Sequence, residues 1–405
     1  MYRIDHGFNQ EDMQEMNRAL LIRLLREEGV CARANLAKRS KLKQATVTNI
    51  INDFISWGLV REVGYLVGKK GRRSVGISIN NDDYGVIGIQ LARKHYGVGV
   101  YDLSGREIVK ECIQTEPKSS SREVMDGILG IVGQQISACG ERKILAIGAA
   151  VPGPYSVKRG RIELMTGYSG WPDIAIGQEL EERFGVPVFL DNDANAGALA
   201  QYWYDPKRNR DEVLIYIADG QGVGAGIVNH GEILKGVLGM AGEIGHMSID
   251  YRGARCACGN YGCLESYCSS IAFTREVNRI LGPMKEFTFR EAADMAKSGN
   301  PIVTEIYLKC CDYLSWGIAN IVNCFNPTAI VIGDEMSHVL PGVMLDRVRR
   351  EVERRVIPEI YANLTISMSA IENSMIHGAA VGAITEIFYE PGKFFYENDS
   401  EMNTL

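Results

Sequence analysis

The amino-acid sequence predicts an α/β protein with a winged helix-turn-helix head at its start and a two-lobed α/β body behind it. Three observations predict this: a basic helical segment between positions 1 and 80, buried strands that alternate with helices from position 82 onward, and a cluster of one histidine and three cysteines near position 256. The 405 residues suffice for two or three domains. The composition, 46% hydrophobic and 23% charged, is ordinary for a soluble globular protein.

The charge is divided unevenly along the chain. The segment 1–80 holds 14 Lys and Arg against 8 Asp and Glu, whereas the segment 81–405 holds 30 against 42. A basic head on an acidic body indicates that the head alone meets a polyanion.

Apolar periodicity predicts helices at residues 11–28, 33–39 and 44–57, the last two joined by a tight turn. The third helix buries one face and begins with short polar side chains, which is typical of a helix that reads base edges in the major groove. Strands near 59–65 and 75–79 flank a basic loop that forms a wing for phosphate contact. The candidate DNA-contacting residues are Lys43, Gln44, Ala45, Thr46, Thr48 and Asn49 on the helix, and Lys69, Lys70, Arg72 and Arg73 on the wing.

The first part of the body begins with buried strands and ends in a polar cluster. Strands are predicted near 85–91, 96–103, 107–113 and 144–151, with a helix from 121 to 138. A short strand at 188–190 leads into Asp191-Asn192-Asp193-Ala194-Asn195. Ligands bind at such strand ends in open α/β sheets, so Asn192 and Asp193 are placed to hold hydroxyls or to accept a proton. On residue chemistry alone, this cluster is also typical of a turn and helix cap.

The second part of the body again alternates strands with helices. A strand at 213–218 precedes a glycine-rich turn at 220–226, which could approach a phosphate closely. A helix at 301–325, strands at 328–333 and 364–370, and a helix at 374–389 follow. The predicted domains are a head at 1–80, a first lobe at 81–195 completed by residues 374–405, and a second lobe at 196–373 that carries the cysteine cluster and a dimerisation surface.

The cluster consists of His246, Cys256, Cys258 and Cys263, spaced H-x9-C-x-C-x4-C. Three thiolates and one imidazole suit a structural Zn²⁺, and reduced thiols indicate a cytoplasmic location. Glu243 and Glu265 flank the cluster, where carboxylates could accept hydrogen bonds from sugar hydroxyls, although solvated loop charges explain them equally well. No apolar run has the length of a membrane span, and the N-terminus lacks a signal-peptide pattern, so no membrane insertion is expected.

Together these motifs resemble the ROK family (repressors, open reading frames and kinases), through the head, Pro152-Gly153-Pro154, the Asn192–Asn195 cluster, the 220–226 turn and the His246 cysteine set. The resemblance implies an actin- or hexokinase-like (ribonuclease H-like) duplicated fold. The head places the chain in the repressor branch, similar to the xylose and N-acetylglucosamine repressors. The sugar-binding residues implied by the resemblance are Asn192, Asp193, Glu243, His246 and Glu265, and Asp193 matches the general base of the family's kinases.

The chain departs from the family's kinases at their Asp-x-Gly-Gly-Thr phosphate loop, where it has Gln90-Leu91-Ala92-Arg93-Lys94. Because phosphoryl transfer depends on positioning and charge neutralisation, this change predicts a non-enzyme in which Asp193 is vestigial. The expected protein is a sugar-responsive repressor, a homodimer or tetramer on a palindromic operator. Two alternatives stay open: an ATP-dependent sugar kinase with a fused DNA-binding head, and a repressor sequestered by a sugar-transporter protein.

Overall fold

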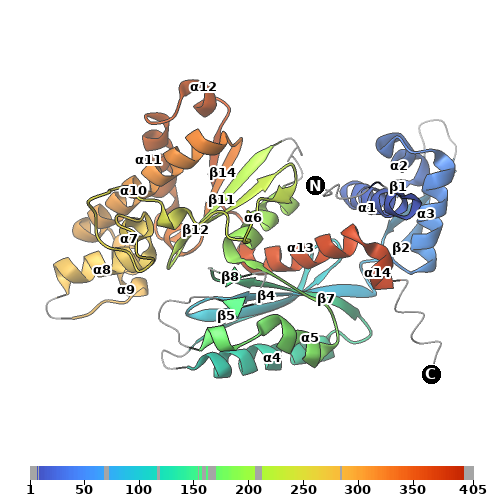
Figure 1. Ribbon diagram of the computed structural model, residues 1–405, viewed down its shortest axis with the longest axis horizontal. Coiled ribbons are helices and arrows are strands. Elements are labelled where there is room, and N and C mark those ends of the chain that lie inside the picture. The colour runs from blue at the N-terminus through green and yellow to red at the C-terminus, as the bar shows by residue number, and fades with distance from the viewer. Residues whose placement is uncertain are drawn as a thin grey trace.

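The computed structural model describes residues 7, 9–67, 73–115, 119–153, 155–156, 161–162, 170–205, 212–282 and 285–395. Three helices and a small antiparallel sheet form the N-terminal part, separate from two larger sheets (Figure 1). No helix in these ranges is long and apolar enough to cross a membrane.

The N-terminal part, called the head below, comprises residues 9–80. Its elements are α1 (Gln10–Glu28), β1 (Cys31–Ala32), α2 (Arg33–Ser40), α3 (Gln44–Ser56), β2 (Val60–Val67) and β3 (Arg73–Ile79), with strand order β1-β3-β2. Asn9 and Asp12 form a reciprocal capping box at the start of α1. Lys41 ends α2 in the left-handed conformation with φ 58°, where the sequence offers no glycine. The predicted helices are confirmed, with ends that differ by one position at most.

The first large sheet has the strand order β10-β7-β4-β5-β6. Its strands are β4 (Tyr84–Leu91), β5 (His95–Asp102), β6 (Glu107–Gln114), β7 (Lys143–Val151) and β10 (Val188–Asn192). β4, β5 and β6 pair antiparallel, whereas β4, β7 and β10 pair parallel. The helices α4 (Ser121–Ala138) and α5 (Ile176–Phe184) cover one face; a short hairpin, β8 (Tyr155–Ser156) and β9 (Arg161–Ile162), and the turn η1 (Trp171–Asp173) precede α5. Ser120 and Glu123 form a capping box at the start of α4.

The second sheet repeats this plan with the order β13-β12-β11-β14-β15. Its strands are β11 (Val213–Asp219), β12 (Val223–Asn229), β13 (Glu232–Ile233), β14 (Ala329–Gly333) and β15 (Thr365–Met368). The helices around it are α8 (Ser270–Leu281), α9 (Phe289–Lys297), α10 (Pro301–Phe325), α11 (Pro341–Glu353) and α12 (Pro358–Tyr361). Residues of α10 and α11 share one buried core with this sheet. Two sheets built on one plan show the actin/hexokinase-like α/β architecture.

The segment 220–226, predicted as a glycine-rich turn, is partly turn and partly strand. Only Gly220–Gly222 form the turn, because Gly224 and Gly226 lie within β12. A Cβ atom on Gly226 would come within 2.2 Å of the Ala194 carbonyl oxygen. This glycine therefore admits a neighbouring helix and not a phosphate.

Two helices, α6 (Asp193–Tyr204) and α13 (Ser374–Tyr389), lie between the two sheets and pack against each other (Figure 1). Glycines allow this closeness: a Cβ on Gly378 of α13 would lie 1.6 Å from the Ala196 carbonyl oxygen of α6. The predicted lobe boundary at 195/196 falls inside α6, because the helix runs unbroken from one sheet to the other.

The head shares a buried core with the body. Leu21, Ile22 and Leu25 of α1 belong to the same cluster as Ile384 and Phe388 of α13. The cluster continues through Phe394 and Phe395 of α14 (Pro391–Phe395), the last described element. The head is therefore fixed to the C-terminal helices by apolar packing. Such packing contributes a free energy of about 25 cal/mol per Å² of buried apolar surface.

Candidate functional site

A cavity of about 280 Å³ lies where the two sheets meet. It is lined by the ends of β4, β7 and β10, the start of α6, the β11–β12 turn and the residues after β14. The loop that ends in η2 (Ile244–His246) and the start of α7 (Glu265–Cys268) close it. The structure brings all five predicted sugar-binding residues to this cavity: Asn192, Asp193, Glu243, His246 and Glu265.

The start of α6 supplies an amide and a carboxylate. Asn192 is the N-cap, and its side-chain oxygen accepts a hydrogen bond from the Ala194 backbone nitrogen at 2.9 Å. Asp193 accepts from the same nitrogen at 2.7 Å. Burial first, and then the Glu243 carboxylate, raise the pKa of Asp193 from 3.8 to about 6, against the opposing effects of its backbone hydrogen bonds and of Arg93. Asp193 is thus a buried carboxyl group at the cavity with a pKa of about 6.

Gly153 lets these groups converge. A Cβ at this position would lie 2.6 Å from the Asn192 side-chain nitrogen and 2.8 Å from Glu243 Oε1. The glycine of the Pro-Gly-Pro segment therefore leaves room for an amide and a carboxylate to face the same volume. Burial raises the pKa of Glu243 as well.

His246, Cys256, Cys258 and Cys263 form a compact cluster beside the cavity. Their candidate ligand atoms all lie within 4.8 Å of one another. Cys258 Sγ is 3.6 Å from Cys263 Sγ, and Cys256 Sγ is 3.9 Å from His246 Nδ1. Tetrahedral ligands about 2.3 Å from a Zn²⁺ ion stand about 3.7 Å apart, so the spacing fits such an ion.

The loop that carries the cluster is shaped by short backbone bridges. Ser248 pairs with Cys263 and Arg255 with Tyr261. Gly262 has φ 66°, and a Cβ there would lie 1.8 Å from the Asp250 carbonyl oxygen, so only glycine fits this crossing. The fold of this loop brings the three cysteines together with His246.

The two nitrogens of His246 face different partners. Nδ1 lies on the cysteine side, whereas Nε2 lies 4.0 Å from Glu243 Oε2. A metal on Nδ1 would leave Nε2 to donate toward the cavity. Glu265 sits between the two environments, since its Oε1 is 3.4 Å from His246 Nδ1 and 3.3 Å from Cys256 Sγ. Its carboxylate can therefore support the cluster as well as line the cavity.

The far end of the cavity is acidic. Asp334 follows β14 with φ 75° and ψ −172°, a conformation strained for any residue but glycine. A Cβ on Gly220 would lie 2.3 Å from its Oδ2, so the carboxylate stands directly against the β11–β12 turn. Burial, then Glu335 and Asp193, raise the pKa of Asp334 from 3.8 to about 7. Two lining residues, His95 and Glu335, are absent from the sequence-based prediction; their only signal is that each adjoins the end of a buried strand.

The segment Gln90–Lys94, predicted to replace the kinase phosphate loop, lies at one edge of the cavity. Gln90 is buried and its side-chain nitrogen donates to Met375 Sδ at 3.0 Å. Ala92 and Arg93 line the cavity, and Lys94 is exposed.

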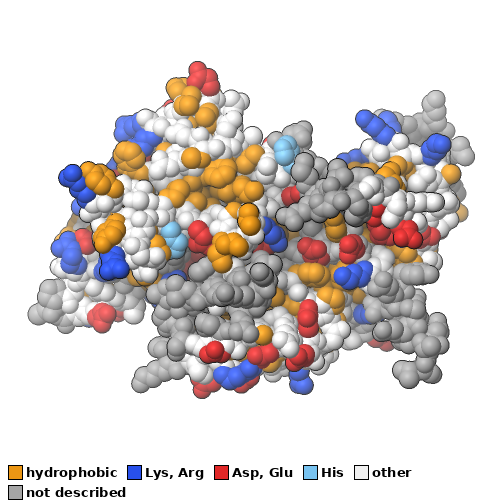
Figure 2. All heavy atoms as spheres, viewed as in Figure 1, with side chains coloured by type: hydrophobic (Ala, Val, Ile, Leu, Met, Phe, Trp, Pro, Cys, Tyr) orange, Lys and Arg blue, Asp and Glu red, His pale blue; other side chains and the backbone are white. Residues whose placement is uncertain are grey.

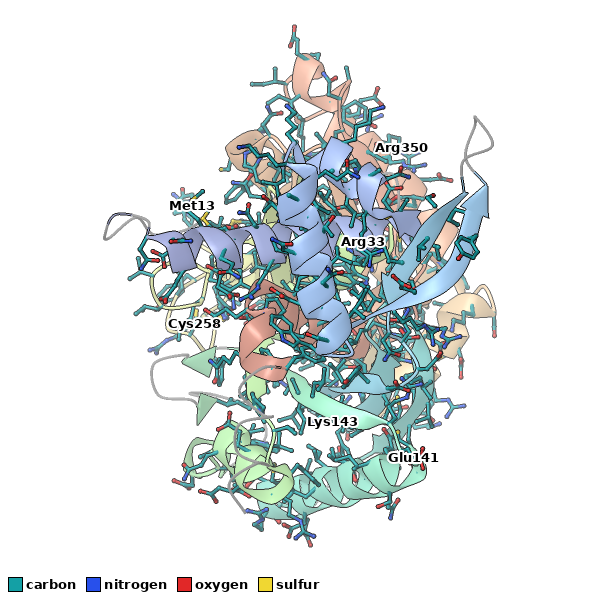
Figure 3. The ribbon with its side chains drawn as sticks, turned by 90° about the vertical axis from the view of Figure 1, so that its right-hand side faces the viewer. Met13, Arg33, Glu141, Lys143, Cys258 and Arg350 are labelled. Carbon is teal, nitrogen blue, oxygen red and sulfur yellow. The ribbon has the colours of Figure 1, made fainter. Side chains whose placement is uncertain are left out.

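The predicted DNA-contacting residues of α3 lie on its accessible side. Lys43, Gln44, Ala45 and Asn49 are exposed, while Thr46 and Thr48 are half-buried. Lys69, Lys70 and Arg72 lie outside the described residues, as does the side chain of Arg73. Figure 2 shows Lys and Arg side chains at the outer end of the head. Figure 3 faces the head, with Arg33 near its centre and the strands β2 and β3 projecting at one edge.

Comparison with known proteins relates this geometry to a family. The chain is 30% identical to a xylose repressor of Bacillus spizizenii over 87% of this chain and 90% of that protein. It is 28% identical to the DNA-binding transcriptional dual regulator NagC of Escherichia coli over 93% of both. The fold matches a ROK family transcriptional regulator, a homologue of the E. coli MLC protein, with TM-score 0.79, 27% identity and coverage of 93% of this chain and 97% of that chain.

A kinase shares the body. A ROK hexokinase from Thermus thermophilus matches with TM-score 0.61 and 28% identity, over 75% of this chain and 99% of that one. The family model described as ROK matches residues 86–386. The chain belongs to the ROK family.

Proposed function

We propose that this chain is a transcriptional repressor that binds operator DNA through its head and responds to a sugar bound in the cavity. One observation supports the proposal above all. The same molecule has a basic helical head and a polar cavity lined by Asn192, Asp193 and Glu243, and the head packs against the body through a shared buried core. The relatives named as a xylose repressor and as a DNA-binding transcriptional dual regulator match 87% and 93% of the chain, so each match includes at least part of the head.

The head acts as a winged helix-turn-helix. The exposed N-terminal end of α3 is the part that enters the major groove, with Gln44 and Asn49 toward base edges and Lys43 toward a phosphate. The loop between β2 and β3 is the wing. The protein acts as a homodimer, because two heads related by a two-fold axis match the half-sites of a palindromic operator.

The sugar site uses carboxylate, amide and imidazole groups as hydroxyl partners. Asn192, Asp193, Glu243 and His246 offer acceptors and donors from separate segments, which suits a ligand with hydroxyls on several sides. The donor set of the cysteine cluster fits a structural Zn²⁺. When bound, this ion would fix the loop from which Glu243 and His246 reach the cavity.

The cavity is unsuited to a nucleotide. A kinase needs groups that neutralise phosphate, yet Gln90 is engaged with Met375 and the Asp334 carboxylate stands against the β11–β12 turn. One observation favours a kinase as the second candidate: Arg93 lines the cavity close enough to Asp193 to lower its pKa. That candidate requires ATP-dependent phosphorylation of a sugar.

The test is binding of the purified protein to DNA from its own upstream region at fixed salt, titrated with D-xylose, D-glucose, N-acetyl-D-glucosamine and their phosphates. The proposal expects tight binding that one sugar weakens at least tenfold. Glu243→Gln should abolish the response while DNA binding persists, and Glu141→Gln, an exposed glutamate remote from the cavity, should change nothing.

The other outcomes separate the alternatives. Specific DNA binding that ignores every sugar would replace the sugar with a protein partner such as a transporter. A lack of specific binding, together with phosphate transfer from ATP to a sugar, would establish the kinase.

A further inference from the structure

The head meets the body through several polar contacts in addition to apolar packing, among them the hydrogen bond from the Tyr84 hydroxyl to the Trp57 carbonyl oxygen and the ion pair of Arg61 with Asp82. A further contact joins α1 to α6. The Arg26 guanidinium at the end of α1 donates to the Trp203 carbonyl oxygen at 2.7 Å. The same guanidinium lies over the Trp203 ring, 3.3 Å from its centroid. A hydrogen bond and a cation–π contact to one residue fix both the position and the orientation of that residue against the head.

Trp203 is held equally firmly on the body side. Its Nε1 donates to the Ser104 carbonyl oxygen at 3.1 Å, and its ring stacks on Phe388 of α13 at a centroid distance of 6.4 Å. Arg26 therefore contacts a ring that has little freedom of its own.

Trp203 belongs to α6, and the other end of α6 is the ligand cavity. Asn192 caps this helix and Asp193 is its first residue. A helix of 12 residues is about 18 Å long. One short, continuous helix thus has two proposed sugar-binding residues at its start and the head's anchoring residue in its last turn.

Helix α6 cannot move without its neighbours. The Ala196 carbonyl oxygen would lie 1.6 Å from a Cβ on Gly378 of α13, and the Ala194 carbonyl oxygen 2.2 Å from a Cβ on Gly226 of β12. Backbones in such close contact shift together, because packed interiors transmit strain. Helix α13 in turn packs against α1.

We infer that α6 is the element that carries ligand occupancy to the head, and that Arg26 is the positioning residue that receives it through Trp203. The inference rests on the proposed function. A sugar that binds Asn192 and Asp193 shifts the start of α6, and the shift displaces Trp203 at the other end of the helix. The head rotates together with Trp203, so that the two heads of a dimer no longer match the operator spacing. A merely adhesive role for Arg26 would affect stability but not the response to sugar.

The experiment compares full-length wild type, Arg26→Ala, Arg26→Lys and Arg39→Ala. Arg39 is the matched control, since its ion pairs with Glu27 and Glu28 stay within the head. DNA affinity is measured with and without D-xylose, D-glucose or N-acetyl-D-glucosamine, sugar affinity by calorimetry, and folding by the thermal midpoint. Arg26→Ala should keep the sugar affinity within about threefold while its DNA response falls from tenfold or more to less than threefold.

Arg26→Lys should give an intermediate response, which keeps the test decisive if Arg26→Ala fails to fold. A wild-type response in a folded Arg26 variant with normal sugar affinity overturns the inference. Failure of the proposed function looks different: wild type itself then shows no specific DNA binding or no sugar response.

In that case hydrogen exchange still decides the point. Asp193→Asn should alter amide exchange in α1, and the alteration should vanish when Arg26→Ala is added. Unchanged exchange in α1, or a change that survives the loss of Arg26, refutes the role of this contact.

Discussion

Asp334 is a residue whose removal should stabilise the protein. Its backbone has φ 75° and ψ −172°, and its carboxyl group stands against Gly220 and near Glu335. Asp334→Gly relieves a backbone strain of about 1–3 kcal/mol. It also removes a carboxyl whose pKa rises from 3.8 to about 7 on folding.

The charge contribution depends on pH with a definite sign. A carboxyl group with a raised pKa in the folded state costs nothing below its unfolded pKa, and its cost grows as the pH rises from about 4 to about 7. That cost is on the order of 2–4 kcal/mol above pH 7. The change loses the hydrogen bond from the Glu335 nitrogen to the Asp334 side chain, about 1 kcal/mol. The net gain should therefore be about 2–6 kcal/mol at pH 8, and about 1–3 kcal/mol smaller at pH 5.

Urea unfolding at both pH values measures this, with Asp334→Asn as the internal control. The asparagine variant removes the charge but keeps the side chain at a positive φ, so it should gain stability at pH 8 and little at pH 5. Loss of stability in Asp334→Gly at pH 8, or equal gains at both pH values in both variants, would refute the reasoning.

Two further predictions concern the metal and the helix crossing. The purified protein should hold about one zinc per chain by elemental analysis. Cys263→Ser should lose the zinc, whereas Cys268→Ser should retain it, because Cys268 is a buried thiol in the same segment but outside the cluster. Equal zinc retention by the two variants would exclude the cluster as the site. Gly378→Ala should lower the unfolding free energy by about 1–3 kcal/mol because its Cβ meets the Ala196 carbonyl. Gly382→Ala, with nothing nearer than 3.9 Å, should be neutral or stabilise α13 by up to about 1 kcal/mol. Thermal melts in which both variants behave alike would contradict the close crossing.

Much of the architecture is readable from the sequence because local signals agree with the final fold. The predicted bounds of the helices at 301–325 and 374–389 match the structure at both ends, since long apolar periodicity marks both and Asn300 caps the first. The cysteine cluster is readable for a similar reason: its ligands lie close together in the sequence, between His246 and Cys263, so spacing alone indicates proximity.

Other features depend on contacts between distant segments. His95 and Glu335 share a cavity although they lie far apart in the sequence, and neither belongs to a motif. The glycines at 224 and 226 have the composition of a phosphate loop, but the structure uses Gly226 to admit α6. The predicted lobe boundary at 195/196 falls inside α6, whose packing against both sheets depends on residues far away in the sequence.

The shared core of α1 with α13 and α14 has a consequence for how such proteins exchange parts. A head that completes its own hydrophobic interior can be transplanted between proteins as a cassette. This head cannot, because residues near the far terminus, among them Ile384, Phe388 and Phe394, form part of its interior. A chimera that swaps the segment 1–80 alone would replace one side of this shared core and keep the other, so a working exchange has to include the segment of α13 and α14 as well.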